Sequence, residues 1–175
     1  MEAAREPSAG YICSYEPLIH NRAGRAAVAL GEHRYVDRSP RREPDFEACY
    51  PSITSRCRRT LFAPRLRPGD TVAYWTKAGW WDGAKRRLVA VLVVEERFEA
   101  HEDAAGWYRA RGLGLPSNLI VDGNPPKPYE RTSKRFREDI WLRDYERRAE
   151  SCPVVLACSA RYLELDDPAP LSDAD

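Results

Sequence analysis

Three kinds of side chain in this sequence could take part in chemistry: tryptophans beside glycines, clustered arginines, and single polar residues at the ends of predicted strands. The tryptophans lie between Leu66 and Glu96, in the stretch LRPGDTVAYWTKAGWWDGAKRRLVAVLVVEE. Rings this large normally lie in a core. Two interpretations of Trp80 and Trp81 stay open. Either they pack on the fold, one of them on a neighbouring element, or they form an aromatic wall for a planar ligand.

Arginine is concentrated in two parts of the chain. From Arg34 to Arg67 there are nine arginines against four acids, and from Arg131 to Arg148 there are seven basic residues against four acids. A guanidinium group binds phosphate through two parallel hydrogen bonds and stacks on bases, so this distribution is typical of nucleic-acid contacts. It is equally typical of a solvated protein face, and the sequence leaves both interpretations open.

The ligand-binding interpretation predicts a site for a nucleobase and its phosphates. Alternation along a strand places Tyr74 and Thr76 on one face and Trp75 on the other. The amide of Asn118 has the donors and the acceptor that the edge of a base requires, although asparagine is also a common turn residue. The expected base-binding residues are Tyr74, Trp75, Thr76, Trp80, Trp81 and Asn118, and the expected phosphate-binding residues are Arg56, Arg58, Arg59 and Lys77.

The common catalytic motifs are not found in the sequence, which has no GxGxxG, P-loop, GxSxG or HExxH pattern. If the protein is an enzyme, Lys77, Thr76 and Glu95 at the ends of two predicted strands are the expected catalytic residues. The histidines and cysteines are too scattered for a metal site. We therefore expect neither a metal nor a cofactor.

The elements that would position these residues begin with a turn at Pro68-Gly69-Asp70. Thr71–Thr76 and the aliphatic run Leu88–Val94 predict two strands. Helices are predicted from a cap at Ser52 to Arg59, over His101–Arg111 before Gly112, and from Thr132 or Ser133 to Ala149. Further predicted strands are Tyr11–Tyr15, Leu119–Val121 and Cys152–Ala160, and His33–Glu43 is predicted as an exposed loop.

Length and composition predict one domain over residues 10–165, between a disordered segment 1–9 and a disordered acidic tail 166–175. Five cysteines, an odd number, indicate reduced thiols and a cytoplasmic location. No run of about 18 apolar residues occurs, so we expect no membrane partner.

The order of these parts resembles the PUA-like superfamily, which includes the EVE, ASCH and YTH domains. The resemblance lies in PGD followed by TVAYWT, in LVAVLVVEE and in the short helix after it. The layout is most similar to the bacterial and phage nucleotide-modification-associated domains. The lysine–threonine signature of ASCH domains is not in its usual place, and the tryptophans of a YTH cage have no matching positions.

The resemblance implies an α+β fold, a small and mostly antiparallel β-barrel with helices packed on the outside. It also implies a nucleic-acid-binding module that holds a flipped, single-stranded or modified base in an aromatic-walled pocket, with DNA or RNA as the partner. Two alternatives remain: a hydrolase or other enzyme acting on a modified nucleoside or base, and a module that binds small molecules or proteins.

Overall fold

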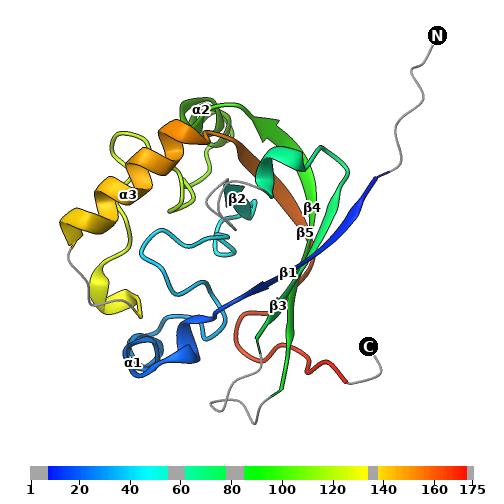
Figure 1. Cartoon of the computed structure of the whole chain (residues 1–175), viewed down its shortest axis with the longest axis vertical. Coiled ribbons are helices and arrows are strands. Elements are labelled where there is room, and N and C mark those ends of the chain that lie inside the picture. Colours follow the sequence, from blue (N-terminus) through cyan, green and yellow to red (C-terminus); the bar gives the residue numbers. More distant parts are fainter. Residues whose placement is uncertain (1–7, 55–61, 78–84, 134–137, 173–175) are drawn as a thin grey trace.

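The computed structural model of the chain describes residues 8–54, 62–77, 85–133 and 138–172 (Figure 1). Its strands are β1 (Gly10–Tyr15), β2 (Ser52–Thr54), β3 (Thr71–Thr76), β4 (Leu88–Phe98) and β5 (Val155–Leu163). Its α-helices are α1 (Arg22–Ala29), α2 (His101–Ala110) and α3 (Glu138–Ser151). Short 3-10 turns are η1 (Leu18–His20), η2 (Ala63–Arg65) and η4 (Tyr129–Arg131).

The strands form one curled sheet in the order β1-β3-β4-β5-β2. β1 runs parallel to β3, and the other neighbours are antiparallel. The prediction of an α+β fold is confirmed, but the predicted closed barrel is wrong. β1 and β2 are the two edges of the order and do not pair with each other in the described chain, so the sheet is a half-barrel.

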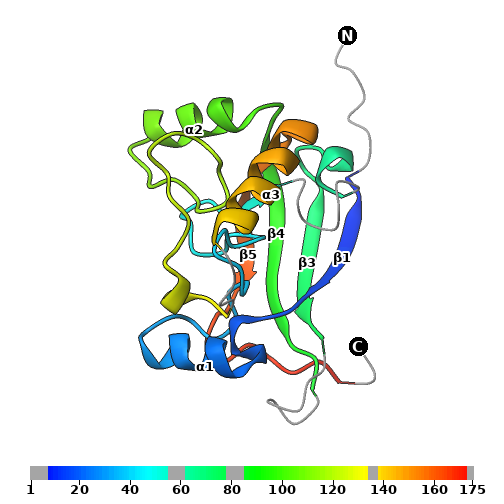
Figure 2. The same ribbon diagram turned by 60° about the vertical axis from the view of Figure 1, so that its left-hand side comes forward.

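The three α-helices lie on the side toward which the sheet curls (Figure 2). They cover the open side of the half-barrel, whereas the prediction placed them outside a closed barrel. The convex face of the sheet carries no helix in either view. Among the described residues, no helix is long and apolar enough to cross a membrane.

The β3–β4 pair matches its sequence pattern closely. Val72, Tyr74 and Thr76 of β3 are buried, while Thr71, Ala73 and Trp75 are half-buried on the convex face. The turn before β3 has the predicted conformation, with φ of +94° at Gly69, a value that favours glycine. The Asp70 carboxylate closes the turn, because its Oδ2 accepts a hydrogen bond from the Arg67 amide at 2.9 Å.

The expected exposed loop at His33–Glu43 is instead largely buried. Arg42 has no exposed surface and Arg41 only 7%. Burial is possible because backbone carbonyl oxygens and carboxylates accept hydrogen bonds from both guanidinium groups. Nη1 of Arg41 donates to the carbonyl oxygens of Ser117, Leu119 and Asn124. The buried arginines Arg41 and Arg42 therefore stabilise the fold.

Two predicted elements form different structures. Ser52 and Ile53 belong to strand β2 and pair with Ala157 and Leu156, because β5 offers them a free edge. The rest of the predicted helix, residues 55–61, lies outside the described residues. Residues 119–121 form no strand, since side chains bind their backbone: Leu119 O accepts from Asn124, and the Ile120 amide donates to His101.

The last part of the chain returns to the sheet as predicted, with β5 between β4 and β2. Residues 165–171, which we call the C-terminal strap, then run beside the start of β4. The Leu88 amide donates to Ala169 O at 3.1 Å, and the Leu171 amide donates to Arg86 O at 2.8 Å. Part of the segment predicted as a disordered tail thus lies along the β3–β4 hairpin.

Candidate functional site

A basic and aromatic surface lies where β3 ends and β4 begins. The guanidinium of Arg86 lies over the ring of Trp75, 5.2 Å from its centroid. Lys77 and Lys85, the next described residues on the two sides of the hairpin loop, are exposed. We call Trp75, Lys77, Lys85 and Arg86 the hairpin surface. It contains two of the residues predicted from sequence, Trp75 and Lys77.

The positive charge of the hairpin surface is not neutralised within the described part of the chain. Lys77, Lys85 and Arg86 form no ion pair with any described residue. The neighbouring cation Arg87 behaves differently, because its Nη1 lies 3.2 Å from Asp167 and donates to Pro168 O in the C-terminal strap. Asp167 of the strap therefore pairs with Arg87, and Asp166 pairs with His33. Among the described residues, no acid neutralises the three cations of the hairpin surface, so they can bind an anion.

The convex sheet face continues from the hairpin surface. Directly paired residues point to the same face, so Trp75 shares this face with its neighbours Ser14 on β1 and Leu88 on β4. The adjacent row contains Ile12, 69% exposed, then Ala73, Val91 and Tyr162. None of the described helices covers these rows (Figure 2). The result is an open platform with one tryptophan and one tyrosine beside three cations.

The other predicted base-binding residues that the structure describes are buried elsewhere. Tyr74 has no exposed surface and packs edge-to-face against Phe46 and Tyr15, with ring centroids 5.3 and 6.3 Å apart. Thr76 is 2% exposed, and its Oγ1 accepts a hydrogen bond from the Arg87 amide. These aromatic rings fill the inside of the half-barrel.

Asn118 lies in the interior with no exposed surface. Its Nδ2 donates to Ser52 O at 3.0 Å, and its Oδ1 accepts from Ser52 Oγ at 2.8 Å. It therefore joins the 117–121 segment to β2 and does not reach Trp75 or Lys77. The remaining predicted residues, Trp80, Trp81, Arg56, Arg58 and Arg59, lie outside the described residues.

The three residues predicted for catalysis are not brought together. Lys77 and Thr76 lie at the hairpin end of β3, whereas Glu95 follows Val93, which pairs with Thr71 at the opposite end. A strand of this length separates its ends by about 17 Å, so these side chains do not share a site. Within the described residues, no group of three His, Cys, Asp or Glu side chains is arranged to hold a metal ion.

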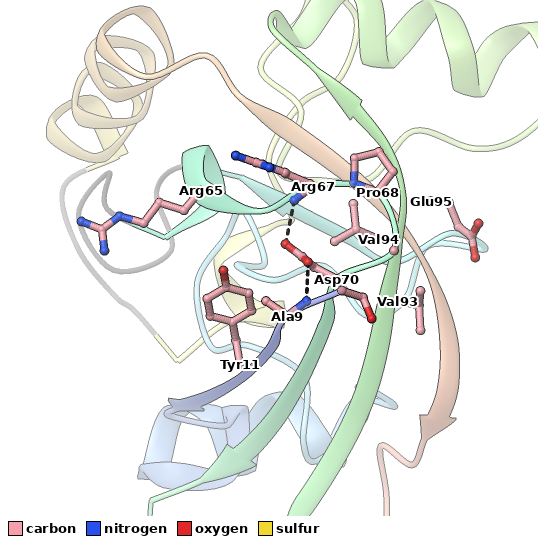
Figure 3. Close-up of a pocket in the computed structure, with 11 residues that line it drawn as sticks. Ala9, Tyr11, Arg65, Arg67, Pro68, Asp70, Val93, Val94 and Glu95 are labelled. Atoms are coloured by element: carbon pink, nitrogen blue, oxygen red, sulfur yellow. Dashed lines mark hydrogen bonds between the residues drawn. The ribbon is translucent and has the colours of Figure 1, made fainter. Parts of the chain in front are cut away.

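A hollow of about 1110 Å³ lies at this opposite end of β3, beside the Asp70 turn (Figure 3). The Tyr11 ring and the Arg65 and Arg67 side chains lie on one side of the sheet, and Val93 and Glu95 lie on the other. Phe62 packs edge-on against Tyr11 with centroids 5.5 Å apart. We call this site the turn hollow.

Partly buried hydrogen bonds fix the backbone around the turn hollow. Oδ1 of Asp70 accepts from the Ala9 amide at 2.8 Å, which ties the start of β1 to the turn (Figure 3). Nη1 of Arg97 on β4 donates to Pro64 O at 3.1 Å and to the carbonyl oxygens of Ala63 and Leu66. Because these carbonyls belong to η2 and its cap, Arg97 holds in place the turn that carries Arg65.

Sequence reasoning missed Lys85, Arg86, Tyr11 and Arg65. For the first two a signal existed: the sequence from Lys77 to Arg87 carries four cations and one acid around the tryptophan-containing loop. Tyr11 and Arg65 lie far apart in the sequence. They meet only because β1 pairs in parallel with β3, an arrangement that no short-range pattern indicates.

Comparison of the chain with protein-family models, curated proteins and solved structures found no significant match. The resemblance to the PUA-like superfamily thus stays a prediction.

Proposed function

We propose that this protein binds single-stranded nucleic acid on the hairpin surface. The observation that carries the proposal is the Trp75 ring, half-buried on an open sheet face and covered by the Arg86 guanidinium, with the unneutralised Lys77 and Lys85 beside it. Basic grooves that follow a phosphate backbone, combined with aromatic rings on which bases stack, characterise proteins that bind single strands.

Each part of the surface supplies one contribution to binding. Stacking of a base on Trp75 is worth about 1–3 kcal/mol. Each cation that neutralises a phosphate releases counterions, which makes affinity depend on salt. Arg86 already stacks on Trp75, so it can hold a phosphate while its plane packs on the ring or on a base.

The openness of the surface favours a base that is already unpaired. Tyr74, Tyr15 and Phe46 fill the interior of the half-barrel, so the described residues leave no deep pocket there for an extruded base. A base on the convex face needs no extrusion from a duplex, a step that costs a few kcal/mol. The PUA-like resemblance supports a nucleic-acid ligand and adds the proposal that the preferred base is modified.

The test is fluorescence polarisation of a labelled single-stranded oligonucleotide titrated with protein at several salt concentrations. Lys85→Gln/Arg86→Gln removes two cations. For a single strand, this substitution should lower the slope of log affinity against log salt by roughly 1.4, because each phosphate contact contributes about 0.7. Trp75→Leu should weaken binding about tenfold with the slope unchanged, because it removes stacking but no charge.

The matched control is Arg22→Gln/Arg109→Gln, which removes two exposed arginines from α1 and α2 on the helical side of the molecule. It alters net charge by the same amount and should leave the salt slope close to that of the wild type. Equal slopes for the wild type and Lys85→Gln/Arg86→Gln would refute the proposal. Parallel titrations with duplex, and with oligonucleotides carrying a methylated base, measure the preferences for strandedness and modification.

A further inference from the structure

The turn hollow is separate from the hairpin surface and has a different chemistry. The two sites lie at opposite ends of β3, and no residue belongs to both. The side chains of the turn hollow that can donate hydrogen bonds come from two parts of the chain that lie far apart in sequence: Ser8 and Tyr11 around the start of β1, and Arg65 and Arg67 just before the turn. Side chains that meet from distant segments indicate a built site more strongly than neighbours in one loop.

We propose that the turn hollow binds a phosphate monoester of nucleotide size. Arg65 is exposed and forms no ion pair with any described residue. The Tyr11 hydroxyl has no hydrogen-bond partner in the described part of the chain, and Figure 3 shows it directed toward the turn. A phosphate accepts hydrogen bonds from both groups, and the fork of an arginine matches two of its oxygens. Arg67 adds a second positive charge.

The two acids near the site do not oppose an anion on the Tyr11 side. Both carboxylate oxygens of Asp70 accept backbone N–H groups, from Ala9 at 2.8 Å and from Arg67 at 2.9 Å, so amide dipoles offset its charge. Glu95 points to the other side of the sheet, where it accepts from Ser159 Oγ (Figure 3). On the Tyr11 side, an anion therefore meets the positive charges of Arg65 and Arg67.

The size of the hollow argues for more than a bare phosphate ion. Pockets that enclose drug-sized ligands measure about 300–1000 Å³, and this hollow reaches about 1110 Å³ in total, counted over the space on both sides of the sheet. The Tyr11 ring, which lines the hollow and packs edge-on against Phe62, supplies an apolar wall. A ring attached to the phosphate can pack there, which makes a nucleotide the ligand that best uses both the charge and the wall.

This phosphate could come from a free nucleotide or from the 5′ end of a nucleic acid. The second source rests on the proposed function, and the first does not. The probe for both is adenosine 5′-monophosphate, with adenosine as the control that lacks the phosphate, in calorimetric titrations of the full-length protein. We expect the monophosphate to bind with a Kd below about 1 mM and adenosine to bind at least tenfold more weakly.

Two substitutions test the assigned donors. Arg65→Gln should weaken binding of the monophosphate about tenfold, as expected for loss of a charge-assisted hydrogen bond. Tyr11→Phe keeps the ring and its packing on Phe62 but removes the hydroxyl, and should weaken binding severalfold. Circular dichroism of both variants verifies that they fold. Arg22→Gln, which removes an exposed arginine on α1, should leave the Kd unchanged.

A competition experiment, in which oligonucleotides displace the bound monophosphate, distinguishes the two sources of the phosphate. If a nucleic-acid end occupies the hollow, a 5′-phosphorylated oligonucleotide displaces the monophosphate better than the same strand with a 5′-hydroxyl. If the ligand is a free nucleotide, the two strands compete equally weakly. The proposal fails if the monophosphate does not bind, or if Arg65→Gln and Tyr11→Phe leave its Kd unchanged.

The hairpin variant Lys85→Gln/Arg86→Gln separates this proposal from the proposed function. It should reduce oligonucleotide binding and leave the Kd of the monophosphate unchanged. Loss of monophosphate binding in that variant would place the ligand on the hairpin surface and overturn the assignment to the turn hollow. A wild-type protein that binds the monophosphate but no oligonucleotide would refute the proposed function alone.

Discussion

Arg42 and Glu47 form an ion pair in the interior of the protein, with Nε of the arginine 3.1 Å from Oε2 of the glutamate. The Arg42 side chain has no exposed surface. Its Nη2 lies 2.7 Å from Glu32, and its Nη1 donates to the carbonyl oxygens of Asp37 and Ser39. One guanidinium thus joins the end of α1 to both sides of the loop that covers the core.

Removal of the Arg42 side chain should destabilise the fold strongly. Arg42→Ala removes the fully buried partner of Glu32 and Glu47, which keep the more exposed Lys127 beside them. Loss of one member of a buried pair costs up to about 3–5 kcal/mol. Urea denaturation measures the change in the free energy of unfolding. The control is Arg38→Ala, because Arg38 pairs with Glu16 where both side chains are 30% exposed. It should cost at most about 1 kcal/mol. Equal losses would contradict the assigned role of Arg42.

The same ion pair predicts how stability depends on pH. Burial raises the pKa of Glu47, but Arg42 and Lys127 more than offset this effect and hold the pKa below its ordinary value of 4.5. The folded state therefore binds a proton less readily than the unfolded state. The stabilisation is complete above the unfolded pKa and is lost as the pH falls through the folded pKa.

Glu47→Gln tests this dependence. At about pH 7 the variant should be less stable than the wild type, and the difference in the free energy of unfolding should shrink below about pH 4 as the wild-type carboxylate is protonated. Denaturation curves across this range measure the difference. Glu146→Gln, at an exposed position of α3, should show little change at any pH. A difference for Glu47→Gln that grows on acidification would contradict the prediction.

Asn118 should contribute to stability and not to ligand binding. Asn118→Leu removes both hydrogen bonds to Ser52 and leaves the buried Ser52 hydroxyl without its acceptor, at a cost of about 1–3 kcal/mol. Oligonucleotide affinity, measured by polarisation on the folded variant, should stay that of the wild type. A stable variant with weakened binding would instead support a role in reading a base.

Two glycines in helices should respond in opposite ways to substitution by alanine. A Cβ at Gly24 in α1 would lie 1.5 Å from the carbonyl oxygen of Leu18, so the backbone must move and Gly24→Ala should lose more than about 2 kcal/mol. A Cβ at Gly106 in α2 meets nothing within 4 Å. Gly106→Ala should gain about 0.4–1 kcal/mol through helix propensity. Thermal unfolding of the two variants distinguishes these outcomes, and similar melting temperatures would contradict the packing of α1 on η1.

Local patterns were sufficient for the elements that pair with near neighbours. Pro68-Gly69-Asp70, the alternation through Thr76 and the aliphatic start of β4 predicted the hairpin, and Gly112 marked the residue after the α2 cap, with φ of +68°. Elements decided by distant partners were not predictable. Ser52 was predicted to be a helix cap, because no residue near it in the sequence indicates that this segment pairs with β5.

The residues of the candidate site also differ in how well the sequence predicted them. Trp75 and Lys77 were found because hairpin residues are close in sequence. The positions of Arg41 and Arg42 depend on carbonyls and carboxylates from the turn after α1, from the 117–124 segment and from η4. Most of these acceptors are distant in sequence, so the charge of the two arginines was predicted to lie on the surface. The sequence does not distinguish an arginine that binds phosphate at the surface from one that donates hydrogen bonds to buried backbone carbonyls. Only the tertiary structure shows which role an arginine has.

The position of β2 in the sheet has a consequence for biosynthesis. Ile53 pairs with Leu156, so its partner leaves the ribosome about 100 residues later, a delay of roughly 5–20 s at 5–20 residues per second. Until then β2 lacks its strand partner, although Ser52 can form its bridge to Asp45 and Thr54 can bond to Glu43. The nascent chain can form the β3–β4 hairpin early, but its core stays uncovered through most of translation. That interval is when a chaperone would act on this protein.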